Sequence, residues 1–247
     1  MIWLANWRAI WSYYRAGLPV GPLRFRRGFT LYHGSGDDPI AHLHEVFADR
    51  CYRRFIDGEL TGVMVDLGAN IGAVTLDWAS RSPRLRIHAY EPYPKANEIL
   101  RHNIETNGLA HRVSVYGDAV GPSIGEMTLW NPMTSVHVTG YGECPSSAQR
   151  TRVVVPMVDL NEVIRRVDGE PITLLKIDTE GAEADILEGA SPSTLRVIGQ
   201  IILEYHNQLC PGAFSRCRKV LDLAGFACRV RPANADGGLL YAWRNSM

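Results

Sequence analysis

Apolar residues recur along this chain with two different periods, which predict an alternation of strands and helices from Val63 onward. Short apolar runs predict buried strands, and apolar positions three and four residues apart predict helices. Strands are expected at 63–66, 85–90, 113–116, 153–155, 172–177, 197–203, 227–230 and 239–243, and helices at 71–81, 94–107, 160–167, 182–187 and 214–223. Strands that alternate with helices indicate an α/β fold with a mostly parallel sheet.

The N-terminal 60 residues do not follow this alternation and predict a helical cap ahead of one α/β domain over residues 61–247. Five aromatic and apolar residues recur there at helical spacing: Trp3, Trp7, Ile10, Trp11 and Tyr14. A short hairpin is expected at 25–32 and a second amphipathic helix at 40–55. We expect an aromatic stripe of this kind to pack on its own domain or on a second subunit. In the second case the protein would be a homodimer that associates through its N-terminal helix. Attachment to a membrane surface is the alternative.

Between Gly121 and Arg152 the periodic pattern breaks into a stretch rich in Gly, Pro, Ser and Thr. A loop of this length inside a domain is usually functional or disordered. We expect this insertion at 121–152, with His137 and Tyr141, to act as a lid over a bound acceptor molecule.

Composition narrows the class of protein. Lys plus Arg equals Asp plus Glu at 26 each, so the chain lacks the basic field of a nucleic-acid-binding protein. The five cysteines are scattered without metal-ligand or disulfide spacing, which favours a reducing, cytoplasmic location. We recognise neither a signal peptide nor a run near the roughly 20 apolar residues of a membrane span. We therefore expect a cytoplasmic protein with no stable membrane insertion.

Acidic residues follow three of the predicted strands. Asp66 ends the first strand and precedes a turn of small residues, Glu91 follows the second strand, and Asp118 follows the third. Ligands of open parallel sheets bind just past the carboxyl ends of the strands. An acid after the second strand can accept hydrogen bonds from ribose hydroxyls. This pattern predicts a nucleoside cofactor.

The turn after Asp66 distinguishes between two cofactors. A dinucleotide fingerprint has glycine at relative positions one, three and six, where this chain has Gly68, Asn70 and Ala73. The carboxylate of Asp66 would attract the ammonium of a methionyl group and repel a pyrophosphate. The charge favours S-adenosylmethionine (SAM) and disfavours a nicotinamide dehydrogenase.

Five motifs occur in order along the chain: residues 66–72, 90–92, 103–109, 118–121 and 175–183. The last, followed by Ile186-Leu187-x-Gly189-Ala190, is the specific one. With these motifs the chain resembles the FkbM family of SAM-dependent O-methyltransferases from about Glu45 to Glu204. The resemblance implies a Rossmann-like, seven-stranded, mostly parallel sheet with an antiparallel C-terminal hairpin.

The resemblance also implies cofactor-binding roles. Asp66 would face the methionyl ammonium, directly or through water, while Gly68 and Gly72 let the turn pass under the cofactor. Asn70 stands where many methyltransferases carry glycine. Glu91 would accept both ribose hydroxyls. The adenine would bind to the side chain of Asp118 and the backbone N–H of Ala119.

Catalysis is expected at Asp178, Glu180 and His206. Strand parity puts Asp178 on the face of Lys176, and Glu204 on the face of His206. His206 has an ordinary pKa near neutrality, which suits a general base. The alternatives are a surface histidine, acids that only start the next helix, and a divalent cation held by Asp178, Glu180 and Glu204. No pattern requires that cation, and we expect no metal.

These features together predict transfer of a methyl group from SAM to a hydroxyl or carboxylate oxygen of a small molecule. By analogy with relatives, the acceptor would be a natural-product intermediate such as a polyketide, sugar or peptide. An RNA methyltransferase is one alternative, because residues 91–109 also resemble tRNA guanine methyltransferases. A non-catalytic SAM-binding subunit is another.

Overall fold

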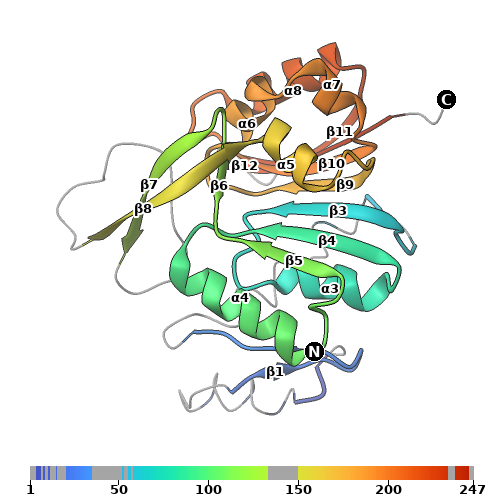
Figure 1. The fold of residues 1–247 in the computed structure, drawn as a ribbon, viewed down its shortest axis with the longest axis vertical. Helices are drawn as coiled ribbons and strands as arrows, with labels where there is room; N and C mark the ends of the chain where they lie inside the picture. Colours follow the sequence, from blue (N-terminus) through green and yellow to red (C-terminus); the bar gives the residue numbers. More distant parts are fainter. Residues whose placement is uncertain are drawn as a thin grey trace.

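A computed structural model (Figure 1) describes residues 4–6, 8, 11, 15, 21–34, 52, 55–56, 58–132, 150–232 and 237–244. Most of the predicted N-terminal helical cap, with the helix proposed for a homodimer, lies outside these residues. His137 and Tyr141 lie outside them as well. Within the described part of the chain, no helix has both the length and the apolar character needed to cross a bilayer.

The central sheet has seven strands in the order β11-β12-β10-β9-β3-β4-β5. Their bounds are β3 Gly62–Leu67, β4 Leu85–Tyr90, β5 Val113–Tyr116, β9 Ile172–Ile177, β10 Gln200–His206, β11 Ala227–Pro232 and β12 Gly237–Trp243. Strands β3, β4, β5, β9 and β10 run parallel, and β12 is antiparallel to both of its neighbours. The predicted mostly parallel sheet with an antiparallel C-terminal hairpin is confirmed.

Helices cover both faces of this sheet (Figure 1). Helices α3 (Ala73–Arg81) and α4 (Pro94–Thr106) lie on one face, with the hairpin β1 (Leu23–Arg24) and β2 (Thr30–Leu31) beyond them. The other face carries α5 (Leu160–Arg166), α6 (Glu183–Gly189), α7 (Pro192–Arg196) and α8 (Ala213–Leu223). Strand β3 shows why: Val63 and Val65 enter one hydrophobic cluster and Met64 the other, and all three are at most 1% exposed. Continuous apolar strands are buried on both faces.

A second, three-stranded sheet occupies part of the predicted insertion. Strands β6 (Ala119–Gly121), β7 (Gly125–Pro132) and β8 (Arg150–Asp159) are ordered β6-β8-β7. The expectation of a loop over the whole of 121–152 is therefore wrong for its two ends. Apolar residues alternate with polar ones in β7, where Leu129 packs with Val155 of β8, but the surrounding turn residues obscured this period. Residues 133–149 lie outside the described residues.

One short helix was missed, and it displaces a predicted strand boundary. Helix α7 begins after Ser191, whose side chain accepts a hydrogen bond from the backbone N–H of Thr194, with Pro192 in the first turn. A serine cap followed by proline is an ordinary helix start. Strand β10 consequently begins at Gln200 instead of Val197.

Strand order reverses between β3 and β9, because the chain moves from β3 to β4 on one side and returns to place β9 on the other. In open α/β sheets the crevice for ligands lies at the carboxyl ends of the strands at this reversal. The residues after β3, β4, β9 and β10 surround this position.

Candidate functional site

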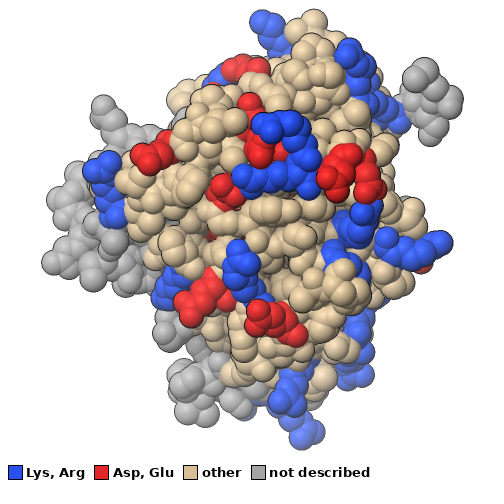
Figure 2. All heavy atoms as spheres, in the orientation of Figure 1, with Lys and Arg blue, Asp and Glu red and all other residues tan. Residues whose placement is uncertain are grey.

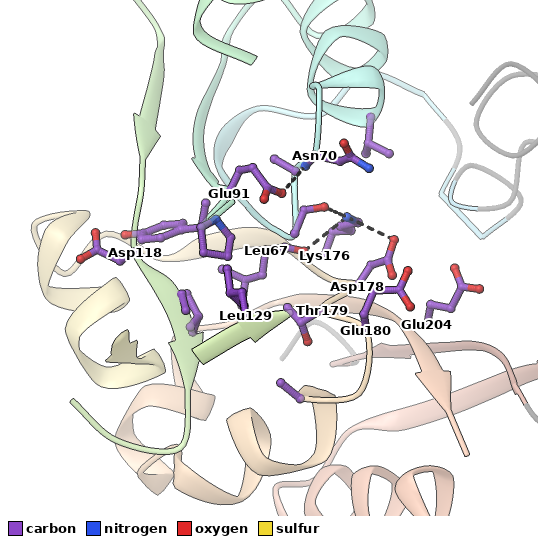
Figure 3. Close-up of a pocket in the computed structure, with 18 of the residues that line it drawn as sticks. Leu67, Asn70, Glu91, Asp118, Leu129, Lys176, Asp178, Thr179, Glu180 and Glu204 are labelled. Atoms are coloured by element: carbon purple, nitrogen blue, oxygen red, sulfur yellow. Dashed lines mark hydrogen bonds and ion pairs between the residues drawn. The ribbon is translucent and has the colours of Figure 1, made fainter. Parts of the chain in front are cut away.

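A cavity opens at the carboxyl ends of β3, β4, β9 and β10 (Figure 3). Most residues predicted for the site line it: Gly68, Asn70, Glu91, Asp118, Ala119, Asp178, Glu180 and His206. Asp66 and Gly72 do not line it. Acidic groups dominate the wall, which includes five carboxylates but only Lys176 and His206 as basic groups among the described residues.

The turn from β3 to α3 forms the floor of the cavity. Gly68 has φ +73°, and a Cβ atom there would lie 1.8 Å from the backbone oxygen of Asp178. Asn70 has φ +50°, a left-handed conformation that asparagine tolerates better than most residues. Its Oδ1 atom is buried and has no hydrogen-bond partner among the described residues. Gly72 caps α3 behind this turn, where a Cβ would lie 2.7 Å from Leu100 Cδ1.

Asp66 lies beneath the turn instead of in the cavity wall. Its carboxylate is 0% exposed, accepts a 2.6 Å hydrogen bond from Thr75 Oγ1 and lies 3.2 Å from Lys176 Nζ. The register of β3 and β9 places Asp66 and Lys176 opposite each other. The sequence led us to expect Asp66 to face a bound ammonium, directly or through water; the structure places Asp66 behind the cavity wall, where Lys176 opposes its charge. The same lysine donates a 2.7 Å hydrogen bond to the carbonyl of Gly68 and so supports the turn.

Glu91 lies at the end of β4 and faces this turn. Its two carboxylate oxygens accept 2.8 Å hydrogen bonds from the backbone N–H groups of Asn70 and Tyr93. Burial raises the pKa of Glu91 to about 7, although the two backbone hydrogen bonds act in the opposite direction. Each carboxylate oxygen keeps a further lone pair for a ligand hydroxyl.

Asp118 and Ala119 lie together at the beginning of β6. Arg166 of α5 donates a 2.7 Å hydrogen bond from Nη1 to the Asp118 carboxylate, and this contact fixes the side chain at the cavity rim. Ala119 is 2% exposed and pairs with Met157 of β8. The two residues predicted for the adenine site thus both line the cavity, as Glu91 and Pro92 do.

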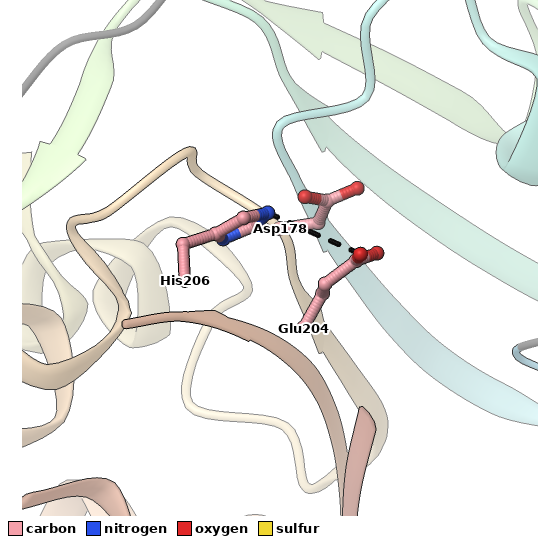
Figure 4. A group of neighbouring side chains, drawn as sticks. All are labelled: Asp178, Glu204 and His206. Carbon is pink, nitrogen blue, oxygen red and sulfur yellow. Dashed lines mark ion pairs between the residues drawn. The ribbon is translucent and has the colours of Figure 1, made fainter. Parts of the chain in front are cut away.

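Strands β9 and β10 are neighbours, so the predicted acid and imidazole meet at the opposite end of the cavity. Asp178, Glu204 and His206 each offer one ligand atom, all within 4.8 Å of one another (Figure 4). Tyr52 approaches from the N-terminal segment, and its hydroxyl lies 2.9 Å from Asp178 Oδ2 and 3.3 Å from Glu204 Oε2.

His206 differs electrostatically from a free histidine. Burial alone would lower its pKa, but a hydrogen bond to Glu183 and the negative charges of Glu183, Asp178 and Glu180 raise the pKa of His206 to about 9. The contact joins His206 Nδ1 to Glu183 Oε1 at 3.1 Å. The sequence led us to expect an ordinary pKa near neutrality, suited to a general base; a raised pKa favours the protonated ring, which is less suited to accept a proton.

Glu180 and Glu183 have separate roles. Glu183 begins α6, and its buried Oε1 also accepts hydrogen bonds from the backbone N–H groups of Thr179 and Gly181. Glu180 precedes the helix with φ +54°, an uncommon conformation for glutamate. Burial and the neighbouring Asp178 raise the pKa of Glu180 to about 7, although His206 acts in the opposite direction.

Sequence reasoning missed Tyr52 as a site residue, because its amphipathic pattern carries no sign of a contact 126 positions away. Met127 and Leu129 of β7 were missed because the strand itself was missed among the turn-forming residues that surround it. They form an apolar wall of the cavity.

Comparisons with known proteins agree with this geometry. Residues 66–228 match the methyltransferase FkbM domain. The chain is 27% identical over 218 residues to the 31-O-demethyl-FK506 methyltransferase FkbM of Streptomyces tacrolimicus, covering 76% of this chain and 82% of that protein. It is 28% identical over 227 residues to the AMB antimetabolite synthetase AmbE of Pseudomonas aeruginosa, covering 76% of this chain but only 10% of AmbE.

The fold also matches a solved structure, methyltransferase FkbM from Methylobacillus flagellatus KT. The TM-score is 0.54 at 16% identity, over 78% of this chain and 46% of that one. A match at this identity concerns the fold alone. The domain match spans all the site residues from Asp66 to His206. This chain therefore belongs to the FkbM family of SAM-dependent methyltransferases.

Proposed function

We propose that this protein binds SAM in the cavity of Figure 3 and transfers its methyl group to an oxygen of a small-molecule acceptor. The observation that carries the proposal is the row of acids at successive strand ends, Glu91, Asp118, Asp178 and Glu204, around a single cavity. A nucleoside with a cationic sulfonium group suits such a wall. The relative from Streptomyces tacrolimicus, whose name describes an O-methyltransferase, supports oxygen as the acceptor atom.

The residues present fit the cofactor. Glu91 has lone pairs for ribose hydroxyls, and the buried Asn70 Oδ1 at the turn could accept a hydrogen bond from the cofactor. Asp118 and the backbone of Ala119 would hold the adenine, and the carbonyl-rich turn at Gly68 would lie under the methionyl part. SAM supplies a methyl group that its sulfonium charge has already activated. The protein must therefore align the acceptor, exclude water and receive a proton.

We propose that Glu180 is the general base that receives the proton of the acceptor hydroxyl. Its pKa of about 7 suits a general base near neutrality, and it lines the cavity. His206 Nε2 lies 3.7 Å from Glu180 Oε2, so the protonated ring would position this carboxylate electrostatically. Asp178 would accept a hydrogen bond from the acceptor hydroxyl and keep it oriented. A carboxylate acceptor would need no base.

The acceptor would lie against Met127 and Leu129, which give one wall an apolar character. That wall fits a largely apolar natural-product intermediate better than a polynucleotide. The insertion residues 133–149 continue from β7, and we propose that they complete the acceptor site.

Transfer of radiolabelled methyl from SAM to a panel of hydroxylated and carboxylated natural products tests this function. We expect label in an ether or ester product, and a loss of more than 100-fold in kcat for Glu180→Gln on a hydroxyl acceptor. Glu188→Gln on α6 is the matched control, because Glu188 pairs with Arg216 outside the cavity. Label on nitrogen or carbon, or equal kcat for both variants, would contradict the proposal.

A further inference from the structure

The end of the cavity formed by β9 and β10 has an excess of negative charge. Asp178, Glu180 and Glu204 line the cavity there, and Glu183 lies directly behind them. The ammonium of Lys176 lies 3.6 Å from Asp178 Oδ2, but it also pairs with Asp66 at 3.2 Å. Among the described residues, the basic groups next to these carboxylates are Lys176 and His206. Several carboxylates brought this close together attract a cation.

His206 is oriented as metal-binding histidines are. The side chain of His206 is 9% exposed, and its Nδ1 atom contacts Glu183, whose side chain is 0% exposed. This contact leaves Nε2 facing the cavity, 4.0 Å from Glu204 Oε1 and 3.7 Å from Glu180 Oε2, beyond hydrogen-bond distance of both. A carboxylate that holds one ring nitrogen of a histidine while the other binds a metal is a recurrent arrangement.

We propose that Asp178, Glu204 and His206 bind one divalent first-row transition-metal ion such as Mn²⁺ (Figure 4). Mixed carboxylate and imidazole ligands select such ions over Mg²⁺ or Ca²⁺, which prefer oxygen alone. The residue pattern along the chain does not require this cation; the pairing of β9 with β10 creates the site.

The distances permit closure around an ion. Metal–ligand bonds of about 2.1 Å place neighbouring ligand atoms about 3 Å apart. The three candidate ligand atoms now lie within 4.8 Å of one another, and the Asp178 and Glu204 side chains are 20% and 30% exposed. Tyr52 already holds the two carboxylates together through one hydroxyl. With the ion bound, Nε2 of His206 would be a ligand and would lose its proton, and the positive charge of the ion would then replace that of the ring beside Glu180.

Titration of Mn²⁺ into the purified full chain, after removal of metals with EDTA, tests the site through the electron paramagnetic resonance signal of free Mn²⁺. We expect one saturable site per chain. Glu204→Gln should weaken it at least tenfold, while Glu188→Gln leaves it unchanged. Pulsed spectra of bound Mn²⁺ should show coupling to a nitrogen nucleus that disappears in His206→Asn.

Absence of a saturable site in the parent chain would overturn the proposal, as would equal affinity in Glu204→Gln and Glu188→Gln. A bound ion with no nitrogen coupling in the parent chain would also overturn it. Thermal unfolding of each variant checks that it is folded, and Glu204→Gln keeps the test valid if the buried His206 variant does not fold. Because binding is measured without SAM or acceptor, failure here is distinct from failure of the proposed methyl transfer.

Discussion

At the scale of single residues, the site depends on carboxylates whose surroundings set them apart. Asp66 is opposed by Lys176 below the turn, whereas Glu91 is buried and accepts hydrogen bonds from backbone N–H groups of the described chain, and Glu180 lies in a strained backbone conformation. These three residues carry the same carboxylate group, and their different surroundings give them different roles at the cavity.

The pKa of Glu91 predicts a pH dependence of cofactor binding. As pH falls from 8 to 6 through the pKa of about 7, Glu91 gains a proton and loses acceptor capacity. The Kd for S-adenosylhomocysteine should rise about tenfold over this range, the limit for one titrating group. Calorimetry at several pH values checks this. Glu91→Gln should bind more weakly at pH 8 and show no such dependence; a pH-dependent Kd in the variant would assign the effect elsewhere.

The raised pKa of Glu91 also makes the stability of the fold depend on pH. Burial raises the folded-state pKa of Glu91 above its unfolded value of about 4.5, so the protonated carboxyl favours folding. Its contribution is fully present below pH 4.5 and is lost as pH rises through 7. Cofactor binding, which uses the charged form, opposes that loss.

The close approach of the Gly68 and Asp178 backbones leaves no room for a side chain at position 68. Gly68→Ala places a Cβ 1.8 Å from the Asp178 carbonyl oxygen, whereas Gly108→Ala has a similar positive φ of +67° with nothing within 4 Å. The control should lose about 1 kcal/mol of unfolding free energy from backbone strain alone. Gly68→Ala should lose at least about 2 kcal/mol more, because two backbone segments must separate. Equal melting temperatures for the two variants would contradict this account.

At the scale of elements, α4 connects the N-terminal hairpin to the cofactor turn. The side-chain amide of Asn103 accepts a hydrogen bond from the backbone N–H of Tyr32 and donates one to its carbonyl. Asn107, one helical turn later, makes the same pair of bonds with Thr30, so the two amides take the place of a neighbouring strand. Asn103 also donates a 2.7 Å hydrogen bond to the carbonyl of Ile71 in the turn. This explains in physical terms why the asparagine motif at 103–109 accompanies the cofactor motifs.

Removing both amides should detach the hairpin. In Asn103→Ala/Asn107→Ala, the amides of Thr30 and Tyr32 should exchange hydrogen at least tenfold faster, because each loses its acceptor. Glu105→Ala, an exposed change on the same helix, is the control. Unchanged exchange at Thr30 and Tyr32 in the double variant would show that other contacts hold the hairpin.

Elements were predictable where local pattern decides them. Strands β4, β5 and β9 have the bounds read from the sequence, because apolar side chains recur at least at every second position of each and polar, turn-forming residues follow them. Strands β7 and β8 were missed in part because turn-forming residues surround their alternation. The acids at strand ends were found, but the Asp66–Lys176 pair and the Tyr52 contacts depend on which strands and segments are neighbours. Spacing along the chain does not contain that information.

At the scale of the whole molecule, the charges agree with a small ligand. The formal net charge is zero, and Figure 2 shows basic and acidic side chains interspersed on one face. The concentration of negative charge lies within the cavity, where screening by solvent is weakest. The acids that line the cavity are thus concentrated at the carboxyl ends of the central strands.

Calorimetric titration of the purified chain with SAM and with S-adenosylhomocysteine tests the central claim most directly. The account predicts one site per chain for both compounds, with affinity at least tenfold weaker in Glu91→Gln at pH 8 and unchanged in Glu188→Gln. Absence of a heat of binding with either compound, from a chain shown to be folded by its thermal transition, would contradict it.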